Sequence, residues 1–241
     1  TKNRLVMTAM GVGVGSPSGK ATNEIIRFYE ERARGGAGLI ITEITRVNDV
    51  HGAGEYDQLS LATDDTVESF AKLADAIHRH DSRIFVQLHN PGRESHLVLN
   101  PKVDQLVSSM PIPSYIAPEP TRALTTQEVE SLVVDFGRAA QRAQRAGIDG
   151  VEIHAAHGYL IQQFLSPFDN HRTDKYGGTP ENRRRFLMEI IAEIQKVCGK
   201  DYPISVRLSS SEFLDGMYGE SLTLENTIAD AKACEAAGVA T

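Results

Sequence analysis

Two histidines and a tyrosine stand close together directly after an apolar run. His154 and His157 are three positions apart and Tyr159 follows two positions later, in the stretch HAAHGY that comes after GVEI. Imidazole and phenol side chains are common proton donors and acceptors in catalysis. A lone histidine is usually a satisfied loop residue, but three such groups on one short segment can face the same small molecule. The spacing therefore favours a loop that binds or transforms a ligand.

Two further apolar runs carry polar residues on one of their faces. Gln87 and His89 alternate in IFVQLH, and Ser205 and Arg207 alternate in ISVRL. Because alternate residues of a strand share a face, each run would be polar on one side and aliphatic on the other. A polar face inside a fold needs a ligand or a partner. The two runs are therefore candidate walls of a binding site.

Short strand-like runs alternate with long helical segments along the chain. Five runs are apolar enough for buried strands: residues 4–10, 38–44, 84–88, 150–154 and 204–208. The segments between them repeat apolar residues at three- and four-residue spacing, which predicts helices with one buried face. This alternation predicts an α/β fold with a parallel sheet. In such folds the chemistry lies at the carboxyl ends of the strands, where His154 and His157 stand.

Paired residues mark the starts of two helices. Thr125 and Glu128 are three positions apart, as are Asp65 and Glu68. Both pairs have the spacing of a capping box, in which a side chain accepts a hydrogen bond from the first turn. We expect a helix to begin at each pair.

The composition indicates a globular protein, and we treat residues 1–241 as a single domain. The net charge of −7, from 32 acidic and 25 basic residues spread along the chain, argues against a nucleic-acid partner. No apolar run approaches the roughly 18 residues that span a bilayer, so we expect no membrane partner and a cytoplasmic location. Cys198 and Cys234 have neither a CxxC spacing nor a nearby histidine, which argues against a metal site.

Residues 154–186, HAAHGYLIQQFLSPFDNHRTDKYGGTPENRRRF, resemble the signature of the old yellow enzyme family, the FMN-dependent NAD(P)H:flavin oxidoreductases. KNRLVMTAM, YEERARGGAGLIITE, VQLHNPGR and ISVRLS extend the resemblance over almost the whole chain, in the order that the family has. The chain is most similar to the branch of the 2,4-dienoyl-CoA and enoate reductases. The resemblance implies a TIM (β/α)8-type barrel that takes electrons from NAD(P)H.

The resemblance also implies which residues bind the flavin. The implied FMN contacts are Thr8, Ala9, Met10 and Gly11 through their backbone, together with Ile44, Gln87 and Arg207. Gln87 would hydrogen-bond the pyrimidine edge of the ring. Arg207 would lie near N1 and the C2 carbonyl, where its permanent positive charge would stabilise the reduced flavin.

His154, His157 and Tyr159 resemble the substrate-binding and catalytic residues of the family. The two histidines would donate hydrogen bonds to the carbonyl oxygen of an α,β-unsaturated compound, while hydride from flavin N5 reduces its C=C bond. Donors aimed at that oxygen would stabilise the transition state more than the ground state. Tyr159 is the candidate proton donor to the α-carbon.

Some positions depart from the family pattern. Family members usually carry Pro where Ala9 stands, and Thr or Cys where Gly11 stands, the latter side chain lying near the flavin and tuning its potential. Cys198 and Cys234 lie too far along the chain to attach the flavin, so we expect noncovalent FMN.

We expect an incomplete barrel, truncated at both ends, with about five strands and the start of a sixth at Gly238–Ala240. The phosphate-binding loops would lie beyond residue 241, as would any iron–sulfur cluster of the C-terminal region. The open sheet edges lead us to expect a homo-oligomer. Two alternatives stay open: an inactive barrel fragment that self-associates, and an amine-dehydrogenase-type flavoenzyme. We expect the stretch from Asn100 to Arg122 to form a long loop beside the pocket.

Overall fold

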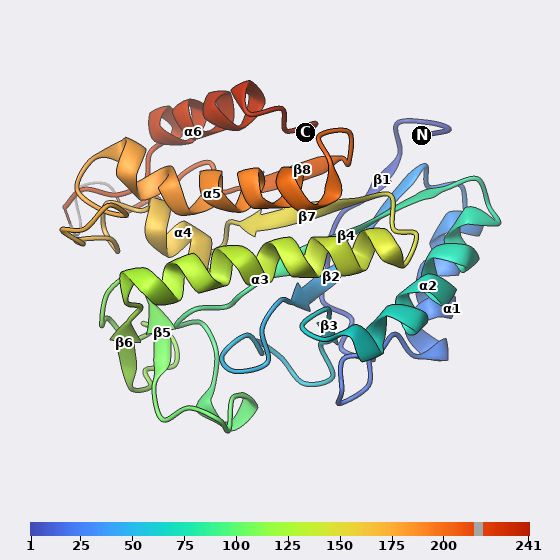
Figure 1. Ribbon diagram of the computed structural model, residues 1–241, viewed down its shortest axis with the longest axis horizontal. Coiled ribbons are helices and arrows are strands. Elements are labelled where there is room, and N and C mark those ends of the chain that lie inside the picture. The colour runs from blue at the N-terminus through green and yellow to red at the C-terminus, as the bar shows by residue number, and fades with distance from the viewer. Residues whose placement is uncertain (215–218) are drawn as a thin grey trace.

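The computed structural model describes residues 1–214 and 219–241. Its main sheet is parallel, and its strands lie side by side in chain order (Figure 1). These strands are β1 (Val6–Met7), β2 (Leu39–Arg46), β4 (Arg83–His89), β7 (Gly150–Ala155) and β8 (Ile204–Leu208). The five expected strands are therefore present. The first is shorter than expected, because only Val6 and Met7 pair with β2 at this exposed edge.

Helices cover one side of the sheet, and sequential helices pack against one another (Figure 1). They are α1 (Asn23–Arg34), α2 (Val67–His78), α3 (Thr126–Arg145), α5 (Pro180–Cys198) and α6 (Leu224–Ala236). A short helix that we did not expect, α4 (Leu160–Leu165), follows Tyr159. Within the described ranges, no helix combines the length and apolar character that crossing a bilayer requires.

One of the two expected capping boxes forms. The Thr125 side chain accepts from the Glu128 N–H, and the Glu128 carboxylate accepts from the Thr125 N–H, at the start of α3. A helix also begins at the Asp65–Glu68 pair, since α2 starts at Val67, but the capping box predicted there does not form. Asp65 lies inside a 3₁₀ turn, η1 (Asp64–Thr66), and accepts from the Thr63 hydroxyl instead of capping α2. A neighbouring acid in that turn, Asp64, is held by Arg142 of α3, which fixes the turn in this form.

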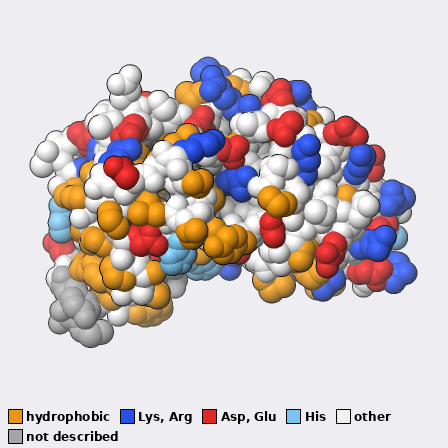
Figure 2. All heavy atoms as spheres, turned by 90° about the horizontal axis from the view of Figure 1, so that it is seen from below, with side chains coloured by type: hydrophobic (Ala, Val, Ile, Leu, Met, Phe, Trp, Pro, Cys, Tyr) orange, Lys and Arg blue, Asp and Glu red, His pale blue; other side chains and the backbone are white. Residues whose placement is uncertain are grey.

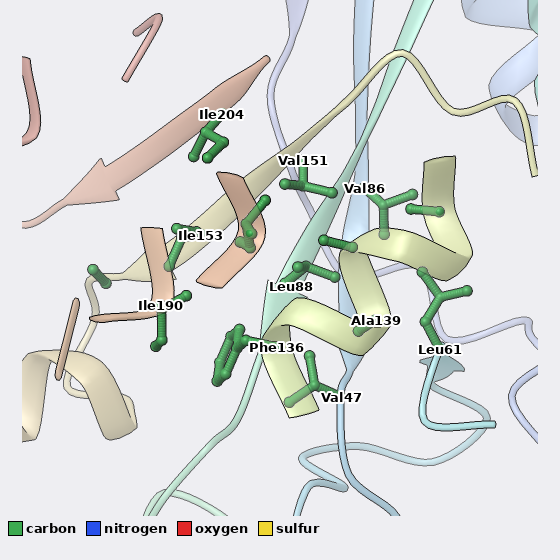
Figure 3. Packing of buried hydrophobic residues seen from close by; sticks show 14 of the residues in the cluster. Val47, Leu61, Val86, Leu88, Phe136, Ala139, Val151, Ile153, Ile190 and Ile204 are labelled. Carbon is green, nitrogen blue, oxygen red and sulfur yellow. The ribbon is translucent and has the colours of Figure 1, made fainter. Parts of the chain in front are cut away.

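The hydrophobic core lies between the sheet and its helices. Aliphatic residues at alternate positions of β4, β7 and β8 lie against α3 and α5, as Figure 3 shows. The labelled strand residues are Val86, Leu88, Val151, Ile153 and Ile204, and all of them are buried. Burying one such side chain stabilises the fold by roughly 1.5–3 kcal/mol. The helical side of the sheet is therefore the side that holds the fold together.

The other side of the same strands is polar. Gln87 pairs in register with Ile44 on one side and Glu152 on the other, and Glu152 pairs with Ser205. Further along the strands, His154 pairs with Arg207. Since side chains alternate along a strand, these residues face away from the helices. The sheet thus presents a polar inner face towards the carboxyl ends of its strands.

The segment expected to be a long loop contains additional structure. After β4 the chain forms a 3₁₀ turn, η2 (Leu97–Leu99), and then β5 (Leu106–Ser108), which pairs in parallel with β6 (Thr121–Ala123). Arg172 donates to the carbonyl of Leu124, just beyond β6, at 2.5 Å. A two-residue strand, β3 (Leu59–Ser60), pairs in parallel with Thr45 and Arg46 at the end of β2.

Candidate active site

The structure brings the predicted catalytic residues together. The ring centroid of His154 lies 5.0 Å from that of His157 and 5.0 Å from that of Tyr159. His89, at the end of β4, joins the same group, with its ring 5.3 Å from His154 and 4.5 Å from Tyr159. The cluster therefore combines three imidazoles and one phenol at the carboxyl ends of β4 and β7.

His154 is held as a neutral imidazole. Burial, followed by the nearby charges of His157 and Arg207, lowers its pKa to about 3. Its Nδ1 atom accepts a hydrogen bond of 3.3 Å from the backbone N–H of Ala156. A neutral imidazole that accepts at Nδ1 carries its proton on Nε2. His154 is thus a hydrogen-bond donor through Nε2 at neutral pH.

A tight turn carries His157 and Tyr159. His157 has a φ of 61°, a left-handed conformation that is uncommon for a residue with a side chain. Its backbone N–H donates to Ser209 Oγ at 3.0 Å, which ties the turn to the segment after β8. Burial, and then the charge of Arg207, lowers the pKa of His157. This hydrogen bond to the segment after β8 therefore helps to hold the strained backbone in place.

Tyr159 directly precedes α4, and its phenol keeps its proton at neutral pH. Burial, followed by the negative charges of Glu55 and Glu94, raises the pKa of its phenol. Its ring meets that of His89 edge-on, with the two planes at 89°. Tyr159 is therefore a proton source within a cluster of neutral imidazoles.

The polar inner face fixes the orientation of Gln87. Its Nε2 atom donates to Glu152 Oε1 at 2.7 Å, and Ser205 Oγ donates to the other Glu152 oxygen at 3.3 Å. Burial raises the pKa of Glu152, while the Gln87 hydrogen bond and the positive charge of Arg207 oppose that shift. Glu152 thus determines which way the amide of Gln87 points.

Arg207 connects the last strand of the sheet with the start of the chain. Its Nη1 atom donates to the carbonyl of Ala9 at 3.2 Å. The predicted flavin segment, which runs from Thr8 through Met10 to Gly11, is thereby held beside β8. Because Ile44 lies opposite Gln87 in register, the predicted flavin residues meet at one end of the sheet.

Three residues of this region had no role in the sequence-based prediction: Glu43, Glu55 and Glu152. A fourth, His89, was predicted only as part of a polar strand face and not as a member of the catalytic cluster. The alternation in β4 did place His89 on the polar face, and a glutamate within the apolar run of β2 was the available signal for Glu43. Glu55 lies in the loop after β2, where no periodicity marks it. Its position depends on the tertiary fold.

The inner face fits a flat ligand with polar edges. Several buried atoms have no hydrogen-bond partner among the described residues: Glu43 Oε1, Glu55 Oε1 and both ring nitrogens of His89. Buried polar atoms normally find a partner, so their concentration here indicates a ligand or water. Gln87 and Arg207 add a polar amide and a permanent cation beside these atoms. This donor and acceptor set suits the ring of FMN.

Figure 2 shows the surface of the molecule from below the view of Figure 1. Histidine side chains lie beside hydrophobic ones towards the lower edge of this view, left of its centre, whereas many charged side chains of both signs lie on the right. This face therefore offers apolar contacts and imidazoles together.

Known proteins resemble this chain over nearly its whole length. The NADH oxidase of Thermoanaerobacter brockii is 42% identical over 239 residues, which make up 99% of this chain and 36% of that protein. The NADPH dehydrogenase of Listeria innocua serovar 6a is 40% identical over 239 residues, or 99% of this chain and 67% of that protein. The chain thus spans about a third of the first relative and about two thirds of the second.

A solved structure confirms the fold class. The old yellow enzyme homologue from Zymomonas mobilis matches with a TM-score of 0.86 and 31% identity, over 99% of this chain and 68% of that chain. The curled parallel sheet is therefore part of a TIM barrel, and the predicted old yellow enzyme resemblance is confirmed. The closer similarity to the dienoyl-CoA and enoate reductases stays a prediction. The model of the NADH:flavin oxidoreductase / NADH oxidase family matches residues 1–239, and the chain belongs to this family.

Proposed function

We propose that this chain forms the FMN-binding part of an oxidoreductase that uses NADH or NADPH to reduce the activated C=C bond of an α,β-unsaturated carbonyl compound. Family membership supports the flavin and the nicotinamide donor. The observation that carries the substrate class is the neutral His154, which lies beside His157 and Tyr159 on the polar side of the sheet.

The flavin residues would bind and orient the ring. The backbone from Thr8 to Gly11 would lie along it, with Ile44 as a further contact. Gln87 would meet its pyrimidine edge in the orientation set by Glu152. Arg207 would keep a positive charge beside it at any working pH. Bound FMN supplies the hydride, and the chain's own side chains do the remaining work.

The imidazoles would bind the carbonyl oxygen of the substrate. His154 can donate from Nε2 without changing its charge, because its Nδ1 atom is already occupied by the Ala156 N–H. A fixed donor gains strength as negative charge develops on the oxygen, and it does not need to reorganise during the reaction. His157, with its ring 5.0 Å from that of His154, would provide the second donor.

Tyr159 would give the proton that completes the reduction. Its raised pKa means that the phenol is protonated at neutral pH and ready to donate to the α-carbon. Its ring lies next to that of His154, so the donor of the proton and the donors to the carbonyl oxygen share one pocket.

A flavin titration tests the proposal. The purified chain should bind FMN one-to-one with a change in its visible absorbance, and NADH or NADPH should bleach the bound flavin without oxygen. A cyclic enone should then restore the colour much faster than the matching saturated ketone. A chain that binds no FMN would contradict the flavin role, while equal reoxidation by the two ketones would contradict the substrate class. The homo-oligomer and the cytoplasmic location stay predictions.

A further inference from the structure

Glu55 places its carboxyl group in the space directly in front of Gly11. A Cβ atom added to Gly11 would lie 3.1 Å from Glu55 Oε2 and 3.4 Å from Glu55 Oε1. Gly11 is not among the glycines with a positive φ, so its backbone would accept other residues. Glu55 therefore leaves little room for a side chain at residue 11.

A second carboxyl group lies on the same short segment. Glu43 is completely buried, and its Oε2 atom accepts hydrogen bonds from the N–H groups of Val12 at 2.6 Å and Gly13 at 2.9 Å. The Oε1 atoms of Glu43 and Glu55 are both buried without a partner among the described residues. Like charges repel and burial disfavours the ionised form, so both effects oppose the ionisation of Glu55. Burial, and then the charge of Glu43, raises the pKa of Glu55.

The other titratable groups that interact with Glu55 are phenols. Burial is the largest cause of the raised pKa of Tyr29 and of Tyr159, and the charge of Glu55 adds to it in both. Within residues 1–214 and 219–241, no basic side chain forms an ion pair with Glu55. Among these residues, no ion pair therefore opposes the rise in the pKa of Glu55.

We propose that the Glu55 carboxyl group contacts the bound flavin and takes the place of a side chain at position 11. The inference rests on the proposed function, which lays the backbone from Thr8 to Gly11 along the ring. A flavin ring carries carbonyl oxygens and nitrogens at its edges, some of the nitrogens as N–H donors, and a carboxyl group forms hydrogen bonds with such atoms. The segment thus has a permanent cation at Ala9, supplied by Arg207, and a titratable acid at Gly11.

The test measures FMN affinity by fluorescence quenching. Glu55→Ala removes the proposed hydrogen bond to the ring, so its affinity for FMN should be roughly tenfold weaker than that of the wild-type chain. Glu55→Gln keeps a hydrogen-bonding group of the same length and should lose less. The visible absorbance bands of bound FMN should also differ between the wild type and Glu55→Ala.

Two further variants make the result specific. Gly11→Ala inserts a methyl group against the carboxyl of Glu55 and should also weaken FMN binding. Glu24→Gln removes an exposed acid on α1 and should behave as wild type. If the Glu55 and Gly11 variants bind FMN with the affinity and spectrum of the wild type, Glu55 does not contact the flavin, although the flavin function stands. If the wild type binds no FMN, both proposals fail.

Discussion

The two ends of strands β4 and β7 hold their polar groups in opposite ways. At the amino ends, Asp149 accepts from Arg83 Nη1 at 2.9 Å and from the Ile84 N–H at 2.9 Å, and it hydrogen-bonds His78 Nε2 at 2.7 Å. At the carboxyl ends, His89 is fully buried and neither of its ring nitrogens has a partner among the described residues. The amino ends of this pair of strands therefore lie in a network whose hydrogen bonds are all formed, while the carboxyl ends have hydrogen-bonding capacity that the described residues do not use.

This difference separates stability from function within a single layer of structure. Three hydrogen bonds to one carboxylate stabilise the register of β4 against β7. A buried imidazole without a partner costs stability, because its nitrogens have lost water and gained no replacement. Natural folds accept such costs mainly at functional sites. The carboxyl ends of the strands are therefore where the chain gives up stability for ligand binding.

The largest expected effect is on the proposed reaction and concerns the carboxyl ends. His154→Phe keeps an aromatic ring but removes the Nε2 donor, so the rate of enone reduction should fall by about 10²–10³-fold. His78→Phe makes the same change at the amino ends, and there the rate per folded molecule should stay near wild type. Stopped-flow reoxidation of the reduced flavin measures both. Similar losses in the two variants would remove the distinction between the two ends.

The next effect is on stability and concerns the amino ends. Asp149→Ala leaves the Ile84 N–H and two basic side chains without their acceptor, so the free energy of unfolding should fall by about 2–3 kcal/mol. Asp75→Ala, on the exposed side of α2, serves as the control and should change it by less than about 0.5 kcal/mol. Urea denaturation measures both values. FMN affinity that falls together with stability in Asp149→Ala would show that the amino ends also serve the site.

The smallest effect is a pH dependence that comes from the carboxyl ends. Because the pKa of His154 is about 3 in the folded chain and 6.5 in the unfolded chain, unfolding takes up a proton below pH 6.5. The free energy of unfolding should therefore decrease as the pH falls below 6.5. Between pH 7 and pH 5 the wild type should lose about 2 kcal/mol more than His154→Phe. Urea denaturation at both pH values tests this, with the exposed His171→Gln as a control that should follow the wild type.

The sequence was sufficient to predict the five main strands and the helical segments between them, since alternating periodicities decide which segments pair and which cover them, but it did not predict α4 or the β5–β6 pair. It also placed His154, His157 and Tyr159 at one strand end, because they follow one another on one short segment. It was less informative about the cap at Asp65. Asp64 in the same turn binds Arg142 of α3, a contact that the local sequence does not show. The position of Glu55 beside Gly11 could not be predicted, because the two residues lie in loops that have no periodic sequence pattern.

The hydrogen bond from Arg207 to Ala9 links residues that are 198 positions apart. During synthesis on the ribosome, the segment from Thr8 to Gly11 is made first but has this anchor only after β8 has left the exit tunnel. A nascent chain therefore cannot complete the proposed flavin-binding segment before β8 has emerged, and FMN capture should follow that step.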